Sequence, residues 1–425
     1  MIFSRTSANI YRSDVQSPSS APQLKRSISL LQLSLYGIGT TVGAGIYVLV
    51  GVAAGYAGHN IALGFLLSAV IVAPSALSFA TLSRRNPVSA GEAAYVQDAF
   101  GNKTLSLIVG LAVILAGLVS AAAVSRGAVG YVLAIVPTSE ALTLLVIILG
   151  LGAVAAWGIG QSVFLAVTLA VIELCGLMVV IGVGIPHLSL EGLSNALLPD
   201  ISNGVWPPVF GIFQAALLAF FAFIGFEDIV NLAEETKQPR RTVPLAIAIT
   251  LIVTAVLYMA VSLAAVAVVP PTDLAQSDAP LALVIERGLH GGAAIFAIVA
   301  ILATLNGILV QMVMASRVLY GLARLGRVPA FLGRVNATTH TPLIATSIIV
   351  TMICTLAFAL PLVRLAETTS IITLLIFTMI NLSLLAIEIR ENTGAWRRTR
   401  AGLPSAAGAA TCIGFLAIQL MAPVS

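Results

Sequence analysis

Residues 220–235 read Phe-Phe-Ala-Phe-Ile-Gly-Phe-Glu-Asp-Ile-Val-Asn-Leu-Ala-Glu-Glu, an apolar run in which one glycine precedes two adjacent carboxylates. The segment that contains this run, from Pro207 to Lys237, is 31 residues long. A straight helix needs only ~20 apolar residues to cross a bilayer. We therefore expect this segment to cross a membrane as a bent or unwound helix.

The composition of the whole chain indicates an integral membrane protein. Of the 425 residues, 59% are hydrophobic and only 9% are charged, whereas charged residues make up about a quarter of a soluble domain. The apolar runs lack the alternation of a membrane β-barrel, so an all-α fold is expected. Eleven helical spans are expected, near residues 30–57, 61–82, 104–136, 141–157, 161–185, 207–235, 243–269, 292–323, 343–360, 365–389 and 402–421.

The basic residues predict how these spans are oriented. Most of the 21 lysines and arginines lie in segments that alternate spans leave on one side of the membrane, which places the N-terminus in the cytosol. Eleven crossings then place the C-terminus outside the cell, and the plasma membrane is the expected location. Residues 1–27 lack the apolar core of a signal peptide and are expected to form a flexible cytosolic tail. The basic clusters either only set this topology or also dock anionic membrane lipid.

A second glycine-rich stretch lies in the first span, where residues 36–47 read Tyr-Gly-Ile-Gly-Thr-Thr-Val-Gly-Ala-Gly-Ile-Tyr. This stretch and the 220–235 run each fall in the first of five consecutive spans. We therefore expect two inverted five-helix repeats with broken helices 1 and 6, plus an eleventh helix. The first repeat is then 28–186, followed by an extracellular loop at 187–206, the second repeat at 207–389, and a cytosolic loop with the eleventh span at 390–425. Taken alone, the glycine spacing of the first span is more typical of close helix packing.

Two broken helices predict a binding site at the membrane midplane, an arrangement typical of secondary transporters. Where a helix ends inside the membrane, its freed amides attract a carboxylate and its freed carbonyls attract an ammonium group. An amino acid zwitterion carries both groups, so an amino acid or a related amine is the expected substrate.

Four blocks of the chain resemble, in order, the amino acid permeases of the amino acid/polyamine/organocation superfamily, especially its cationic amino acid transporter branch. These blocks are residues 37–51, 87–101, 223–244 and 315–342. The resemblance implies a leucine-transporter-type fold, alternating access, and import or exchange of amino acids. It also implies that the substrate carboxylate meets backbone amides around Val42, Gly43, Ala44 and Gly45. The substrate ammonium would meet carbonyls near Phe223, Ile224 and Gly225, with Phe226 as a lid.

Glu173 is the main candidate for coupling transport to an ion. Some proton-coupled relatives carry a lysine in the fifth helix, at a position where this chain has Glu173. A charge at membrane depth costs ~2.5–3.5 kcal/mol or more, which is comparable with the ~4 kcal/mol needed to neutralise a carboxyl at pH 7. Glu173 is therefore able to exchange a proton. A permanent pair with Arg126, or coordination of sodium, remains an alternative.

Glu227 lies beside the expected break in the sixth span. It either holds a gate or faces a substrate amine, or it caps the second half of the broken helix, where a carboxylate at a helix N-terminus is stabilising.

Other classes of function lack support in the sequence. The three cysteines and four histidines show neither CxxC nor HxxxH spacing, so no metal site is expected. We find no cofactor motif and no nucleophile with a base, so no catalytic residue and no cofactor is expected. The basic residues lie in short clusters between apolar runs, which argues against nucleic acid as a partner. A receptor that binds an amino acid without moving it would carry the same sequence pattern.

Overall fold

The computed structural model describes residue 26 and residues 28–87, 91–157, 163–199, 206–324, 326–336, 341–391 and 395–421. Over these residues the chain forms helices and no strand, apart from a single parallel β-bridge between Ile28 and Thr236. The all-α membrane fold expected from the composition is confirmed. The predicted tail at residues 1–27 lies outside the described residues, apart from Arg26.

Each of the eleven expected spans coincides with a helix. The sixth span is divided into α8 and the 3-10 helix η3. The helices at these spans are α1 (Leu30–Ala57), α2 (Ile61–Arg85), α4 (Lys103–Leu133), α5 (Glu140–Trp157), α6 (Val163–Gly184), α8 (Trp206–Phe223), η3 (Phe226–Glu235), α9 (Pro239–Val268), α12 (Ala293–Arg324), α13 (Leu343–Ala359), α14 (Leu362–Glu391) and α15 (Ala395–Met421). Shorter elements connect them, namely η1 (Gly58–Asn60), α3 (Gly91–Phe100), η2 (Ile185–His187), α7 (Leu190–Leu197), α10 (Pro271–Gln276), α11 (Pro280–Leu289) and η4 (Ala330–Gly333).

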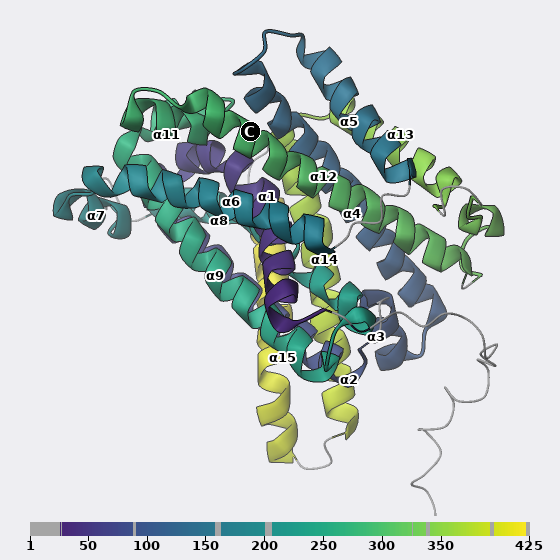
Figure 1. The fold of residues 1–425 in the computed structure, drawn as a ribbon. Coiled ribbons are helices and arrows are strands. Elements are labelled where there is room, and N and C mark those ends of the chain that lie inside the picture. The colour runs from purple at the N-terminus through teal and green to yellow at the C-terminus, as the bar shows by residue number, and fades with distance from the viewer. Residues whose placement is uncertain are drawn as a thin grey trace, which may run out of the picture.

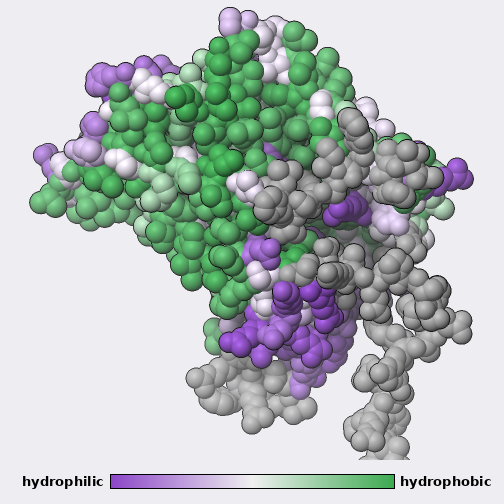
Figure 2. Space-filling model, viewed as in Figure 1, coloured by the Kyte–Doolittle hydropathy of each residue, from purple (hydrophilic) through white to green (hydrophobic). Residues whose placement is uncertain are grey.

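The length and composition of the helices make this a multi-pass membrane protein. Among the described residues, 8 helical stretches are long and apolar enough to cross a membrane, and three further apolar helices are shorter. Figure 2 shows hydrophobic side chains over most of the visible face, with hydrophilic ones gathered mainly at its lower end and along its upper left edge. An exposed apolar surface of this extent fits a chain whose solvent is lipid.

Helix α1 occupies the centre of the bundle (Figure 1). It packs against α8, α9, α6 and α12, while α4 lies along α12 and α14, and α2 lies along α9. Side chains on different faces of α1, among them Leu33, Val42 and Ile46, are all fully buried. A helix that is apolar all round has to be surrounded by other helices, which is why this segment becomes the core.

The expected break in the first span is wrong. Helix α1 is continuous from Leu30 to Ala57. Its glycines instead permit close packing, because a Cβ on Gly45 would lie 2.1 Å from Cα of Ala222, and one on Gly37 would lie 2.3 Å from Cδ1 of Ile229. The alternative reading of the glycine spacing therefore holds. The helix keeps its own backbone hydrogen bonds, and the missing side chains let α8 and η3 approach.

The expected break in the sixth span is confirmed. Helix α8 ends at Phe223, and η3 begins at Phe226 after Gly225, whose φ is 122°. Only glycine adopts such a φ without strain, so the glycine inside the apolar run marks the end of the helix.

Candidate functional site

The break at Gly225 is fitted closely to α1. A Cβ at this position would lie 2.8 Å from the carbonyl oxygen of Thr40. The amide of Ile224 donates to the carbonyl of Phe221 over 3.2 Å, and the amide of Asp228 donates to the carbonyl of Gly225 over 3.1 Å. Both the backbone turn and the close approach of α1 therefore require glycine.

Two side chains donate hydrogen bonds to backbone carbonyls at the break. The hydroxyl of Thr40 donates to the carbonyl of Gly225 over 3.2 Å. The hydroxyl of Tyr258, from α9, donates to the carbonyl of Ala222 over 2.7 Å and to that of Thr41 over 2.8 Å. Tyr258 therefore links α1 to the end of α8. The sequence analysis missed it, although a tyrosine inside an apolar span is a visible signal, because a buried hydroxyl needs a partner.

A small cavity of about 20 Å³ lies beside the break. Helices α1, α4, α8 and α12 all contribute to its wall, with Ile224 next to Gly225. Its polar lining consists of Thr40, Thr41, Ser120 and Gln311. This meeting of four helices is the candidate binding site.

The predicted binding residues fall in two groups around this cavity. Gly45 and Ile224 line it. Val42, Phe223 and Phe226 are fully buried in the surrounding core. The ring of Phe226 contacts the rings of Phe79 and Phe377 edge-on, with centroids 5.9 Å and 5.5 Å apart. This is the usual geometry of packed aromatic side chains. Gly43 and Ala44 belong to α1, but their surroundings are outside the described part of the structure.

A second cavity of about 30 Å³ adjoins the first, because both are lined by Ser120, Ile224 and Gln311. Three acidic residues line it: Glu92 from α3, and Glu227 and Asp228 from η3. We call these three residues the carboxylate cluster. Glu92 and Asp228 were not among the predicted site residues. The acidic pair at 227–228 was visible in the sequence, but nothing in it showed that α3 brings Glu92 to the same place.

The members of the carboxylate cluster are bonded to different degrees. Glu227 accepts a hydrogen bond from the amide of Gly225 at 2.8 Å. This contact at the start of η3 agrees with the capping role, one of the alternatives given for Glu227 above. Asp228 is 5% exposed, and its Oδ2 has no hydrogen-bond partner among the described residues. Burial raises the pKa of Glu92 to about 7. Within the described part of the chain, no group of three or more His, Cys, Asp and Glu residues is arranged to hold a metal ion.

Glu173 lies in α6, close to α1 and α12. It is 1% exposed, and its Oε1 accepts a hydrogen bond from the side-chain amide of Asn306 at 3.3 Å. Its Oε2 has no hydrogen-bond partner among the described residues. The hydroxyl of Tyr47 in α1 donates to its backbone carbonyl at 2.8 Å. A buried carboxyl with one unpaired oxygen thus stands beside the central helix.

The alternative in which Glu173 forms a permanent pair with Arg126 is wrong. Arg126 instead pairs with Glu140 at 2.9 Å and donates to the carbonyl of Ala357 at 2.8 Å. Arg126 lies in the last two turns of α4, and Glu140 begins α5 just after the connecting turn. A long side chain near a helix end keeps its charged group in the more polar surroundings there rather than turning toward the midplane.

Comparison with known proteins is consistent with this arrangement. A family model described as amino acid permease matches residues 28–425. The chain is 30% identical over 397 residues to the branched-chain amino acid permease BcaP of Bacillus subtilis, with 89% of this chain and 84% of that protein covered. It is 29% and 30% identical to the vacuolar cationic amino acid transporters 4 and 2 of Arabidopsis thaliana, with 86% of this chain covered in each case. The chain spans 64% and 60% of the length of these two plant proteins.

Proposed function

Because the chain belongs to the amino acid permease family, we propose that it moves amino acids across a membrane by secondary active transport with alternating access. The observation that carries this proposal is the break at Gly225, which lies inside an apolar span and beside a cavity with polar lining. Helices broken at membrane depth are the elements on which secondary transporters build their binding sites.

The substrate binds, on this proposal, where α1, α4, α8 and α12 meet. The hydroxyls of Thr40 and Thr41 and the amide of Gln311 supply polar contacts from the cavity wall. The carbonyls at residues 223–225, which are predicted to contact the substrate ammonium, are next to this cavity. The predicted contacts of its carboxylate with amides at residues 42–45 require α1 to open locally, since an intact α-helix already uses those amides.

The size of the cavities supports a cycle of opening and closing. A single water molecule needs ~10–15 Å³ of cavity volume. Cavities of about 20 Å³ and 30 Å³ are therefore far too small for an amino acid. The helices around the break must therefore separate to admit a substrate. Opening toward each side in turn is alternating access.

Proton coupling through Glu173 is the mode of energy coupling that we propose. Glu173 is buried beside α1, has one unpaired oxygen among the described residues, and is not paired with Arg126. A carboxyl in such surroundings is able to bind a proton when α1 is in one position and release it when α1 moves. Sodium coupling and uncoupled exchange are the alternatives within the same fold.

The carboxylate cluster favours a substrate with a positively charged side chain. It lies next to the candidate site, and none of the described residues that line its cavity has a basic side chain. An amino acid whose zwitterionic end occupies the first cavity would extend its side chain toward this cluster. The names of the relatives differ on this point, since two are cationic amino acid transporters and one is a branched-chain amino acid permease.

We also propose that the protein resides in the plasma membrane with its N-terminus in the cytosol and its C-terminus outside. The bias of lysine and arginine among the connecting segments supports this orientation.

Counterflow in proteoliposomes tests the proposed function. Vesicles that contain the purified protein are loaded with unlabelled lysine and diluted into a trace of labelled lysine, and the same is done with arginine, leucine and isoleucine. We expect transient accumulation of label, larger for lysine and arginine than for leucine and isoleucine, and none in protein-free vesicles. An amino acid that stabilises the purified protein against heat but shows no counterflow would indicate a receptor instead.

A further inference from the structure

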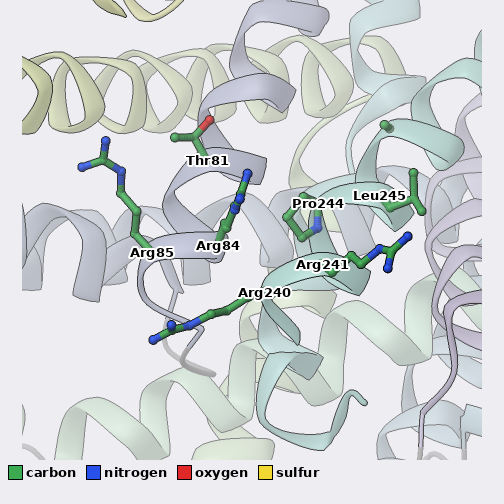
Figure 3. A pocket seen from close by; sticks show the side chains of 8 residues that line it. Thr81, Arg84, Arg85, Arg240, Arg241, Pro244 and Leu245 are labelled. Carbon is green, nitrogen blue, oxygen red and sulfur yellow. The ribbon is translucent and has the colours of Figure 1, made fainter. Parts of the chain in front are cut away.

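A groove of about 1100 Å³ lies between the end of α2 and the start of α9, apart from the cavities at the break. Four arginines line it, Arg84 and Arg85 from α2, and Arg240 and Arg241 from α9. Figure 3 shows these side chains on two neighbouring helices, with Leu245 one turn further along α9. We call this feature the arginine groove.

Most of the positive charge in the arginine groove is not neutralised by the side chains that the structure describes. Arg85 pairs with Glu391 at 2.6 Å. Among the side chains that the structure describes, none forms an ion pair or a hydrogen bond with Arg84, Arg240 or Arg241. Arg240 and Arg241 also stand in the first turn of α9, where the helix dipole disfavours cations. An anion bound between the two helices would relieve both the mutual repulsion and this unfavourable position.

An exposed apolar stripe leads away from the arginines along α9. Leu245, Ala248, Ile252 and Val256 follow one another at intervals of one helical turn, so they share a face of the helix. Ile252 is 64% exposed and Val256 is 62% exposed. Since α9 is among the helices apolar enough to cross a membrane, this face is at the depth of lipid acyl chains.

We propose that the arginine groove binds a phospholipid with a net anionic headgroup, from the leaflet that the basic segments predict to be cytosolic. Guanidinium groups bind phosphate oxygens in pairs, and basic pockets between membrane helices on this side suit anionic headgroups. The lipid headgroup lies among the arginines that line the groove, and one acyl chain lies along the stripe from Leu245 to Val256. The apolar stripe distinguishes a lipid from a soluble phosphate, because only a lipid contacts both the arginines and the stripe. This inference concerns binding alone and does not depend on the transport activity.

Native mass spectrometry of the purified full chain tests the proposal. The protein in neutral detergent is titrated with phosphatidylglycerol or phosphatidylcholine of identical acyl chains. We expect phosphatidylglycerol adducts at a much lower lipid concentration, and a preference that weakens as salt is raised. Each surface arginine contributes roughly a fivefold gain in affinity for anionic lipid. The double variant Arg84→Gln with Arg240→Gln should therefore lose the preference by on the order of tenfold or more.

The control for charge is the double variant Arg317→Gln with Arg334→Gln, which removes two exposed arginines that do not line the groove. It should keep the preference for phosphatidylglycerol. Equal adduct formation by the two lipids in the unmodified protein, or an equal loss in both double variants, would overturn the proposal. Heat stabilisation by sn-glycerol 3-phosphate that matches that by phosphatidylglycerol would assign the groove to a soluble phosphate and would also overturn it.

A measurement on the unmodified chain covers the case in which the groove variant does not fold. Phosphatidylglycerol that carries a photoreactive group on one acyl chain is cross-linked to the protein, and the labelled peptides are identified. We expect labelling within residues 245–256 that unlabelled phosphatidylglycerol suppresses and phosphatidylcholine does not. Labelling spread evenly over the lipid-facing helices, without such suppression, would contradict the proposal.

Discussion

The hydroxyl of Thr40 in the middle of α1 donates a hydrogen bond to the carbonyl of Gly225 at the break between α8 and η3, over 3.2 Å. The first and sixth spans are thus joined directly at the candidate site. One of them is a continuous helix and the other is broken, so movement of η3 and movement of α1 are coupled through this contact.

Substitution Gly225→Ala should destabilise the protein and abolish counterflow. A side chain at this φ costs about 1–3 kcal/mol, and its Cβ would lie 2.8 Å from the carbonyl oxygen of Thr40. Thermal unfolding of the purified protein measures the loss. The control is Gly150→Ala in α5, where a Cβ meets nothing within 4 Å, so the change should be neutral or stabilising by up to about 1 kcal/mol. Equal melting temperatures for Gly225→Ala and the unmodified protein would contradict the strain at the break.

Substitution Tyr258→Phe should lower the stability by about 1–3 kcal/mol, because it removes the hydroxyl that donates to the buried carbonyls of Thr41 and Ala222. The aromatic ring and its contact with Phe223 are retained. Thermal unfolding and counterflow should both be affected, whereas the same substitution at the half-buried Tyr56 should change neither. A Tyr258→Phe protein that melts and exchanges normally would show that the hydroxyl does not hold the two helices together.

Substitution Glu173→Gln should abolish uptake driven by a pH gradient while leaving exchange of labelled for unlabelled substrate intact. The glutamine keeps a partner for Asn306 but is unable to take up or release a proton. Both activities are measured in the same proteoliposomes, with and without an imposed gradient. Glu191→Gln, at an exposed position in α7, serves as the control. An unaltered pH dependence in the Glu173 variant would exclude this residue as the proton carrier.

Glu92 should make the protein less stable as the pH rises. Its pKa is raised from 4.5 to about 7 by burial in the folded protein, so the folded state binds more protons than the unfolded state between these values. The contribution of Glu92 to stability is therefore greatest below pH 4.5, falls as the pH rises toward 7, and is lower by roughly 3 kcal/mol above it. Glu92→Gln should remove this slope and raise the melting temperature at pH 8.

The control for Glu92 is Glu286→Gln, at an exposed position in α11. It should leave the dependence of melting temperature on pH unchanged. A slope between pH 5 and pH 7 that persists in Glu92→Gln would mean that another group, such as a second member of the carboxylate cluster, is responsible.

The fold followed from the sequence where the signal was local. Long apolar runs separated by basic clusters located the helices at the expected spans, and Gly225 with the following carboxylates located the break in the sixth. The glycines of the first span allowed two readings, and the structure agrees with packing because Ala222 and Ile229 fill the space they leave. Which reading applies depends on the neighbouring helix, and a single span does not contain that information.

The amino-acid sequence by itself determined an all-helical membrane protein with a broken sixth span, because hydrophobic length and the conformational freedom of glycine are properties of short segments. Only the tertiary structure decided which polar groups meet. It separated Arg126 from Glu173, placed Asn306 at Glu173 instead, and brought Glu92 from α3 to Glu227 and Asp228. Asn306 lies 133 residues from Glu173 in the chain, so only the packing of the helices brings these two side chains together.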